Sequence, residues 1–189
     1  MQFATHSELV GTHAFLSASN YSWIRYSDDK LVNTFFNKLN AQKGDRLHEV
    51  AKELIQLHIK LPDTTQTLNS YVNDAIGFRM TPEQILFYSY NCYGTADAIH
   101  FDEKKKLLRI HDLKTGVIVK AKMDQLLVYC ALFCLEYGYK ATDLNYILRI
   151  YQNDQIEEYE PDVDEIMHIM DRIVTADRIL EELKVEVFS

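Results

Sequence analysis

Apolar residues recur every three or four positions along the first part of the chain, which is the spacing of amphipathic helices. Residues 28–41 (DDKLVNTFFNKLNA) follow this spacing, and Gly44 interrupts it. The spacing resumes over residues 45–61, before Pro62, and again over residues 65–80. The sequence therefore predicts three helices in this part of the chain. The apolar face of the second helix would consist of Leu47, Val50, Leu54 and Leu57.

The middle of the chain is rich in residues that favour β-strands. Residues 85–94 (ILFYSYNCYG) predict one strand, and residues 94–116 predict a β-hairpin. Residues 117–121 (VIVKA) are mostly β-branched and predict a further short strand. Residues 143–160 predict two strands on either side of an Asn-Asp turn.

Two more helices are expected in the second half of the chain. Residues 125–138 are apolar on nearly all sides, which is typical of a buried helix, and residues 162–184 have an amphipathic pattern. This order of elements predicts an α/β fold with a central mixed β-sheet flanked by α-helices. The 189 residues suffice for a single domain. It would have a helical N-terminal part (1–80), a core that carries the chemistry (81–160) and a C-terminal helix.

The predicted hairpin places charged residues among apolar ones, and its register follows from its turn. The polar run DEKK marks the turn, with residues 103–106 as the loop. Side chains two positions apart on a strand point to the same side of the sheet. One register thus makes two apolar pairs and one pair of carboxylates. The facing pairs would be Phe101 with Leu108, Ile99 with Ile110, and Asp97 with Asp112.

A pair formed by Asp97 and Asp112 would bring two negative charges together, with Cβ atoms roughly 4.5–5.5 Å apart. Carboxylates this close repel each other, and a divalent cation such as Mg²⁺ or Mn²⁺ removes the repulsion. Lys114 shares their side and can orient a water molecule or neutralise a phosphate oxygen, whereas His111 would point to the opposite face. These residues indicate metal-dependent hydrolysis of a phosphodiester. The alternative is an ion triad on a solvated strand end.

Four short motifs, which follow one another along the chain as they do in the family, resemble the PD-(D/E)XK nuclease superfamily. Asp97, followed by the Asp112-x-Lys114 motif, resembles the core of that superfamily. GDRLH (44–48) resembles the G-x-x-x-H motif of its RecB-like branch, and QLLVY (125–129) resembles the Q-x-x-x-Y motif of the same branch.

Two further stretches extend the resemblance to phage-encoded exonucleases of this branch. They are LSASNYSWI (16–24) and GTADAI (94–99), and the match as a whole spans residues 12–152. The resemblance implies a restriction-endonuclease-like core, with a mixed sheet of about four or five strands between helices.

The resemblance also implies a role for each matching residue. Lys114 would act on the attacking water and the scissile phosphate. Gln125 and Tyr129 lie four positions apart on one helix face, where they would support the lysine and touch the substrate. Mg²⁺ is the expected metal, and Mn²⁺ could replace it. Its ligands would be His48, Asp97, Asp112 and the backbone carbonyl of Leu113.

Two departures from the family pattern leave questions open. Some relatives carry a glutamate near the motif histidine, and here either Glu49 or Glu53 could assist the metal. Some relatives hold an iron–sulfur cluster with four cysteines. This chain has three, Cys92, Cys130 and Cys134, and we expect all three to be core residues rather than cluster ligands.

The net charge of the chain limits the ways in which it can bind nucleic acid. A formal net charge of −8 disfavours a protein whose whole surface binds DNA. A local basic patch could still contact phosphates, although a lysine-rich turn is often only solvated. Tyr21, Trp23 and Tyr26 could stack on bases, although packing of their own segment is favoured. The candidate phosphate-binding residues are Lys104, Lys105, Lys120 and Lys122.

Taken together, these features predict a Mg²⁺-dependent deoxyribonuclease, and the resemblance implies an exonuclease in recombination or end processing, similar to phage-encoded members of the branch. We expect DNA as its partner, together with a homo-oligomer or a recombination protein. The alternative is a catalytically silent nuclease fold that binds and inhibits a partner complex; a weaker one is a phosphoesterase acting on nucleotides or RNA. We expect no secretory signal and no membrane span. Three free cysteines fit a reducing compartment, the bacterial cytoplasm or a phage-infected cell.

Overall fold

The structure, a computed structural model, describes residues 14–116 and 122–188. The chain divides into two compact units, with the boundary between Lys43 and Gly44. The expected strand over residues 117–121, with Lys120, lies outside the described residues. Within the described part of the chain, no helix has the length and apolar character needed to cross a membrane.

The first unit contains the short 3-10 helix η2 (Tyr21–Arg25) and the beginning of α1. The indole N–H of Trp23 donates a hydrogen bond to the carbonyl of Ser17 at 3.0 Å. The rings of Phe15 and Phe35 meet edge to face, with centroids 5.0 Å apart. Trp23 therefore helps to fold its own segment.

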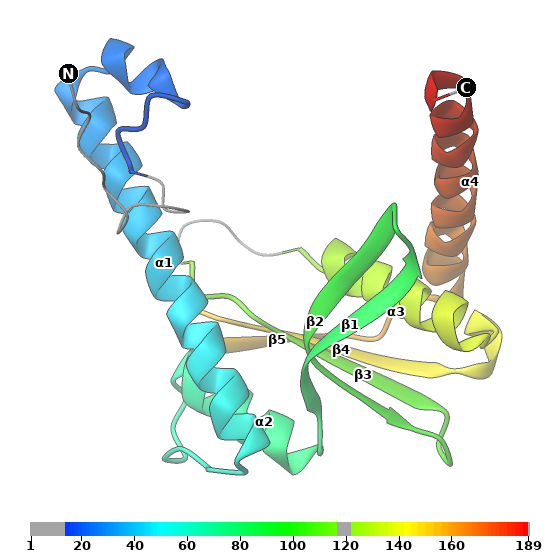
Figure 1. Cartoon of the computed structure of the whole chain (residues 1–189). Coiled ribbons are helices and arrows are strands. Elements are labelled where there is room, and N and C mark those ends of the chain that lie inside the picture. The colour runs from blue at the N-terminus through cyan, green and yellow to red at the C-terminus, as the bar shows by residue number, and fades with distance from the viewer. Residues whose placement is uncertain (1–13, 117–121, 189) are drawn as a thin grey trace. The chain divides into compact units, whose positions relative to one another are not determined.

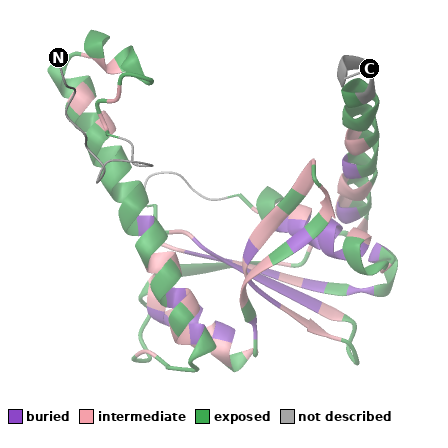
Figure 2. Cartoon of the chain, in the orientation of Figure 1, coloured by how far each residue is buried: buried purple, intermediate pink, exposed green. Residues whose placement is uncertain are grey.

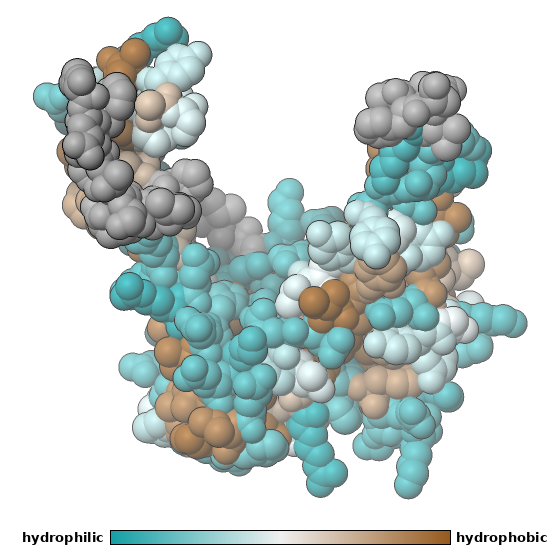
Figure 3. Space-filling model, viewed as in Figure 1, coloured by the Kyte–Doolittle hydropathy of each residue, from teal (hydrophilic) through white to brown (hydrophobic). Residues whose placement is uncertain are grey.

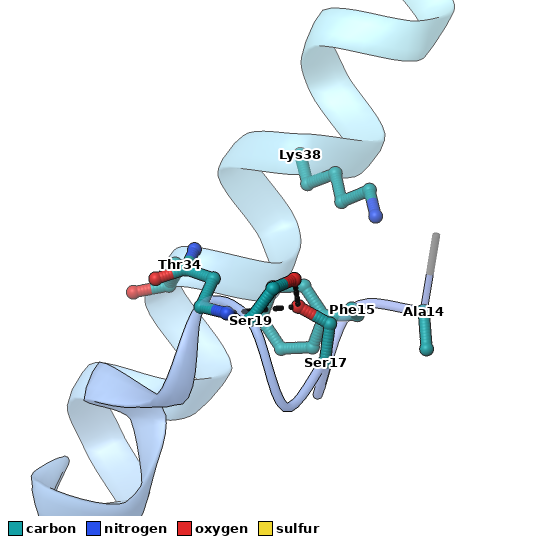
Figure 4. Close-up of a pocket in the computed structure, with 7 residues that line it drawn as sticks. Ala14, Phe15, Ser17, Ser19, Thr34 and Lys38 are labelled. Atoms are coloured by element: carbon teal, nitrogen blue, oxygen red, sulfur yellow. Dashed lines mark hydrogen bonds between the residues drawn. The ribbon is translucent and has the colours of Figure 1, made fainter. Parts of the chain in front are cut away.

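A cavity of about 420 Å³ lies within the first unit (Figure 4). Phe15, Thr34 and Lys38 line it, together with the hydroxyls of Ser17 and Ser19, which are 3.2 Å apart. No residue of the predicted active site borders this cavity. It therefore takes no part in the site described below.

Helix α1 (Asp28–Gln56) is continuous, so the prediction of a break at Gly44 was wrong. Gly44 is buried, and a Cβ atom placed on it would lie 2.6 Å from Oγ1 of Thr115. A helix tolerates one interior glycine at a cost of about 1 kcal/mol relative to alanine. Here the missing side chain allows α1 to approach the segment that follows strand β3.

The buried face of α1 differs from the expected leucine-rich face. Ala51 and Ile55 are buried together with Gly44, whereas Val50 and Leu57 are largely exposed. The helix ends before Pro62 in a Schellman-type turn, in which His58 has a φ of 55°. The amide of Ile59 closes this turn on the carbonyl of Leu54. The apolar pattern therefore identified the helix, but neither its buried face nor its end.

A five-stranded mixed sheet forms the centre of the second unit, with strand order β1-β2-β3-β4-β5 (Figure 1). All neighbouring strands are antiparallel except β3 and β4, which are parallel and connected through α3. This is the predicted α/β fold with a central mixed sheet flanked by helices. The strands are β1 (Thr81–Ser89), β2 (Cys92–Asp102), β3 (Leu107–Leu113), β4 (Asn145–Gln152) and β5 (Gln155–Tyr159).

Two predictions about hairpins had opposite outcomes. The β2–β3 hairpin has the predicted loop, and its pairs from Asp102–Leu107 to Ala98–His111 include the predicted Phe101–Leu108 and Ile99–Ile110. The single strand expected over residues 85–94 was wrong, because a turn at Tyr90 and Asn91 divides it between β1 and β2. This turn lacks glycine and proline, the usual signals for a turn. The β4–β5 hairpin turns at Asn153 and Asp154, as predicted.

Helices cover both faces of the sheet (Figures 1 and 2). On one face, α3 (Asp124–Tyr137) packs on the sheet and α4 (Val163–Phe188) packs on α3, with Cys130 and Cys134 in the core. On the other face, α2 (Thr67–Gly77) and the second half of α1 pack on β3 and β4. The helix predicted to be buried is therefore α3, and most of its residues are buried.

Candidate active site

The site forms where β2 diverges from β3. The last ladder pair is Ala98 with His111, and Asp97 and Asp112 are next in the same register. At this point the amide of Leu113 donates a hydrogen bond of 2.8 Å to Oδ2 of Asp97. The predicted proximity of Asp97 and Asp112 follows from this register, and the charge of Asp112 helps to raise the pKa of Asp97.

Lys114 occupies the position beside Asp112 that the Asp-x-Lys spacing predicts. Its ammonium nitrogen Nζ lies 3.1 Å from Oδ1 and 3.0 Å from Oδ2 of Asp112. The amide of Lys114 donates to the carbonyl of Tyr151 on β4, which holds its backbone next to the sheet. Because 31% of the Lys114 side chain is exposed and only 2% of the Asp112 side chain, the lysine can reach a bound substrate while the carboxylate cannot.

The two residues of the Q-x-x-x-Y motif connect Lys114 to β2. Lys114 Nζ donates a hydrogen bond to Oε1 of Gln125 at 2.9 Å, and Nε2 of Gln125 donates to the hydroxyl of Tyr129 at 3.0 Å. The Tyr129 hydroxyl then donates to the carbonyl of Thr95 at 2.6 Å. Gly94 permits this contact, since a Cβ atom there would lie 3.0 Å from the Tyr129 ring. The structure thus brings the predicted residues Asp112, Lys114, Gln125 and Tyr129 into one continuous network.

His48 and Asp97 form a second group together with a residue that the sequence did not indicate. Nδ1 of His48 lies 3.5 Å from Oδ2 of Asp97. Ligand atoms of His48, Glu83 and Asp97 all lie within 4.8 Å of one another. Glu49 and Glu53, the glutamates considered from the sequence, are both exposed on α1 and are not in this group.

Glu83 was missed because its position depends on the β1–β2 hairpin, which the sequence did not predict. Pro82 pairs with Ala98 and Gln84 pairs with Ala96, so Glu83 lies opposite Asp97. Its backbone has a φ of 52°, a conformation that residues other than glycine rarely adopt. No local signal indicates its place, because Pro82, Glu83 and Gln84 are not residues that favour strands.

Burial raises the pKa of both aspartates, and the charge of Asp112 adds to the shift at Asp97. Burial, and secondly the charge of Asp112, raise the pKa of Asp97 to about 6, although the Leu113 amide, His48 and Lys114 oppose the shift. Burial also raises the pKa of Asp112, and Lys114 opposes this shift. Removing two carboxylates from water is unfavourable unless positive charge compensates them. A bound cation would supply that charge.

The residues present fit a divalent cation. Oδ2 of Asp112 is buried and accepts no hydrogen bond among the described residues, although Lys114 Nζ is 3.0 Å away. An imidazole nitrogen and carboxylate oxygens from separate elements are ligands that divalent cations such as Mn²⁺ accept. His48, Glu83 and Asp97 could hold the ion, and Asp112 lies beside them. Of the four ligands predicted from the sequence, His48 and Asp97 are in the group. Asp112 contacts Lys114, and the amide of Leu113 donates to Asp97. The ligand roles of Asp112 and of the Leu113 carbonyl stay predictions.

His111 belongs to a different part of the molecule. It is fully buried on the opposite face of the sheet, where Nδ1 lies 3.1 Å from the hydroxyl of Tyr151 and the ring meets Phe78 edge to face. Burial, with the charges of Arg149 and Arg109, lowers the pKa of His111 well below its usual value. This placement is the one that strand alternation predicted.

Two lysines of the predicted basic patch lie at the far end of the β2–β3 hairpin from the carboxylates. Lys104 and Lys105 lie in the β2–β3 turn, where their amides donate to the side chain of Asp102. Asp102 lies five positions after Asp97 on β2, a distance of roughly 17 Å along a strand. Lys122 is exposed just before α3. The idea that these lysines flank the site is therefore not supported for the two in the turn.

Comparison with known proteins adds little to this description. No family model and no curated protein matches the chain. Among solved structures, the crystal structure of SSO0001 is similar over 72% of this chain, with 16% sequence identity and a TM-score of 0.37. The chain spans 60% of the length of that protein. A similarity of this size carries no argument about fold or function.

Proposed function

We propose that this chain is a metal-dependent nuclease that hydrolyses phosphodiester bonds of DNA. The observation that carries the proposal is the arrangement of two adjoining groups at the divergence of β2 and β3. One group, His48, Glu83 and Asp97, could hold a divalent cation. The other places the ammonium of Lys114 on the buried carboxylate of Asp112.

Each residue has a role that follows from its contacts. The bound cation would supply Lewis acidity and lower the pKa of a coordinated water. Lys114 is held between Asp112 and Gln125, and its partial exposure lets it donate to a phosphate oxygen or to the attacking water. The charge of Asp112 keeps this lysine at the site when no substrate is present.

Gln125 and Tyr129 would act as positioning residues. Their chain of hydrogen bonds runs from the lysine to the backbone of β2, two residues before Asp97. This connection fixes the distance between the lysine and the metal group, because both then rest on the same strand. Fixed geometry of this kind contributes to catalysis by keeping reacting groups aligned.

The finer parts of the proposal rest on the resemblance to the RecB-like branch of the PD-(D/E)XK nucleases. They are an exonucleolytic mode, Mg²⁺ as the metal, and a role in recombination or DNA-end processing. A protein partner or an oligomer that encloses DNA belongs to the same proposal. The net charge of −8 favours contact with DNA through a cation and a few local groups rather than through a broad basic surface.

The test is cleavage of linear and circular DNA, single-stranded and double-stranded, in Mg²⁺, Mn²⁺ or EDTA. The wild type should cleave only with metal, and Lys114→Ala should lower the rate by about a hundredfold or more, since it removes an electrostatic contact to the reacting phosphate. Lys60→Ala, which changes an exposed lysine outside the site, should retain the wild-type rate.

The form of the substrate then decides the mode of action. Sparing of circular DNA would support an exonuclease. A folded wild type that binds the metal but cleaves none of these substrates would contradict the proposal. In that case the silent nuclease fold that binds a partner complex would be the better description.

A further inference from the structure

Strand β3 carries most of the polar side chains that are buried in the described part of the chain. Hydrophilic residues lie mainly at the surface, where they cover much of the face seen in Figure 3. Four polar or charged residues are buried, and three of them, Arg109, His111 and Asp112, are on β3. Asp112 belongs to the proposed active site. A buried polar group is unfavourable without hydrogen bonds, so the other side of β3 must also offer partners.

The partners of His111 form a polar cluster between α2 and β4. The hydroxyl of Tyr151 donates a hydrogen bond of 2.6 Å to Oδ2 of Asp74, on α2. Arg149 donates to the same oxygen at 2.9 Å, and its Nε donates to Glu158 of β5 at 2.6 Å. Nδ1 of His111 lies 3.1 Å from the Tyr151 hydroxyl. One carboxylate therefore links α2 to two residues of β4 and, through Tyr151, to β3.

The direction of these hydrogen bonds follows from the single proton of the tyrosine hydroxyl. Tyr151 donates that proton to Asp74, so its oxygen accepts a hydrogen bond from the Nδ1–H of His111. Tyr151 is wholly buried, and its ring meets that of Tyr71 on α2 edge to face, with centroids 5.4 Å apart. Hydrogen bonds are strong in such a low-dielectric setting. These contacts fix the side chain of Tyr151 between α2 and β3.

The backbone of the same tyrosine holds the lysine of the proposed site. The carbonyl of Tyr151 accepts a hydrogen bond of 2.9 Å from the amide of Lys114. Leu113 is the last residue of β3 and pairs with Tyr151, so this bond joins Lys114 to the sheet just beyond the end of the strand. Asp74 thus fixes the side chain of the residue that fixes the backbone of Lys114.

The position of Lys114 affects the reaction more than it affects the fold. The lysine must reach a phosphate oxygen or a water while the phosphate lies at the metal group, and a misplacement of about 1 Å can lower a rate by roughly 100-fold. Loss of a buried hydrogen bond also lowers stability, wherever the bond lies. A variant of the cluster therefore needs a control that loses a similar hydrogen bond elsewhere.

We propose that Asp74 and Tyr151 are positioning residues of the nuclease site, which set the place of Lys114 relative to the metal group. Asp74 acts through the side chain of Tyr151, and Tyr151 acts through its carbonyl on the lysine amide. Neither residue needs to touch the DNA. This inference rests on the proposed nuclease function, because it concerns the geometry of the same site.

The first experiment compares two tyrosines of β4 by measuring kcat and KM for cleavage of linear DNA in Mg²⁺. Tyr151→Phe keeps the ring and removes the hydroxyl, and it should lower kcat by roughly 10- to 100-fold with little change in KM. Tyr146→Phe is the matched control. The Tyr146 hydroxyl is also buried and donates to the carbonyl of Ala141 at 2.9 Å, in the core on the other face of the sheet. This control should keep the wild-type kcat while losing a similar amount of stability.

Changes at Asp74 test whether the two residues act as one unit. Asp74→Ala should lower kcat as Tyr151→Phe does, and the double variant should lose no more than either single variant, because both changes remove the same hydrogen bond. Asp74→Asn retains an acceptor oxygen for the Tyr151 hydroxyl, so it should keep most of the wild-type rate. Mn²⁺ should stabilise every variant as it does the wild type, since the metal group is unchanged.

Amide hydrogen exchange gives a readout that does not depend on cleavage. The Lys114 amide lies just beyond β3 and is bonded to Tyr151, so it should exchange through local opening. In Tyr151→Phe the exchange, measured by NMR, should be roughly 5- to 10-fold faster, as expected for the loss of about one hydrogen bond. In Tyr146→Phe it should stay at the wild-type rate.

The two proposals can fail separately. Equal kcat values in Tyr151→Phe and Tyr146→Phe would overturn the inference, and so would an unchanged exchange rate of the Lys114 amide in Tyr151→Phe. If the wild type cleaves DNA and only these differences are missing, the nuclease proposal stands and the positioning roles are lost. If the wild type, folded and with metal bound, cleaves no DNA, both proposals are lost.

Discussion

At the scale of single residues, the ionised form of Asp97 is unfavourable in the metal-free protein. Burial and the neighbouring Asp112 raise its pKa to about 6. In the unfolded chain an aspartate has a pKa of about 3.9. Ionised Asp97 therefore opposes folding unless positive charge is near, and a cation beside His48 and Glu83 would supply that charge.

Asp97→Asn should stabilise the metal-free protein at neutral pH. Below about pH 4 both side chains are neutral and the variants should be equally stable. Between about pH 4 and pH 6 the unfolded wild type releases the Asp97 proton while the folded protein retains it, so the wild type loses stability that asparagine keeps, and the difference levels off above pH 6. The variant should then be more stable by roughly 1–3 kcal/mol. Urea unfolding in EDTA between pH 4 and 8 measures this difference.

Adding Mn²⁺ should make the wild type more stable than Asp97→Asn. Wild type should gain stability from the ion, whereas Asp97→Asn and Glu83→Gln should gain little, because each has lost a ligand group. Glu53→Gln, at an exposed position on α1, should respond like wild type. A stability difference between Asp97→Asn and wild type that stays constant with pH would contradict the explanation.

At the scale of elements, the continuity of α1 shows how a local signal can be overridden. The sequence predicted a helix break at Gly44, but this residue is buried inside α1 against Thr115. Four residues later the same helix face carries His48, which contacts Asp97. The glycine thus allows the close approach that brings His48 to the sheet.

Gly44→Ala should reveal this packing through its dependence on Thr115. Alanine favours a helix over glycine by about 1 kcal/mol, yet its Cβ would lie 2.6 Å from Oγ1 of Thr115. In the wild-type background we expect no gain in the free energy of unfolding, or a loss. In the Thr115→Ala background the same change should stabilise the protein by about 1 kcal/mol.

Thermal unfolding of the wild type, the two single variants and the double variant gives the coupling free energy between Gly44 and Thr115. A non-additivity of roughly 1 kcal/mol is expected for residues in contact. Additive effects would show that Thr115 moves away from Gly44 without cost. The contact would then have no part in placing α1 on the sheet.

At the scale of the whole molecule, the second unit contains both hydrophobic cores of the described chain. Every buried apolar residue of these cores lies after Lys43. The same is true of His48, Glu83 and Asp97 and of the network from Asp112 to Tyr129. The first unit has its own aromatic contact, between Phe15 and Phe35.

A fragment of residues 44–189 should therefore fold cooperatively. Because it retains both cores, its midpoint of thermal unfolding should lie within about 5 °C of that of the full chain. It should also keep the stabilisation by Mn²⁺, since all residues of the metal group are present. Circular dichroism on heating measures both quantities. A fragment that unfolds without a cooperative transition would show that the cores depend on residues 1–43.

Local patterns in the sequence determined much of the site in advance. The turn at residues 103–106 sets the register of β2 against β3, and that register places Asp97 and Asp112 next to each other. The spacing of Gln125 and Tyr129 places both on one face of α3. These relations depend on strand and helix periods over a few residues, so a single sequence is enough to predict them.

Relations between distant segments were decided only by the tertiary structure. Glu83 meets Asp97 because an unforeseen turn at Tyr90 pairs β1 with β2, and His48 meets both because α1 packs on the sheet through Gly44. Phe87 pairs with Tyr93 for the same reason, since one strand over residues 85–94 would not have brought them together. Pairing and packing depend on the best burial available to the whole chain, and no local period encodes that choice.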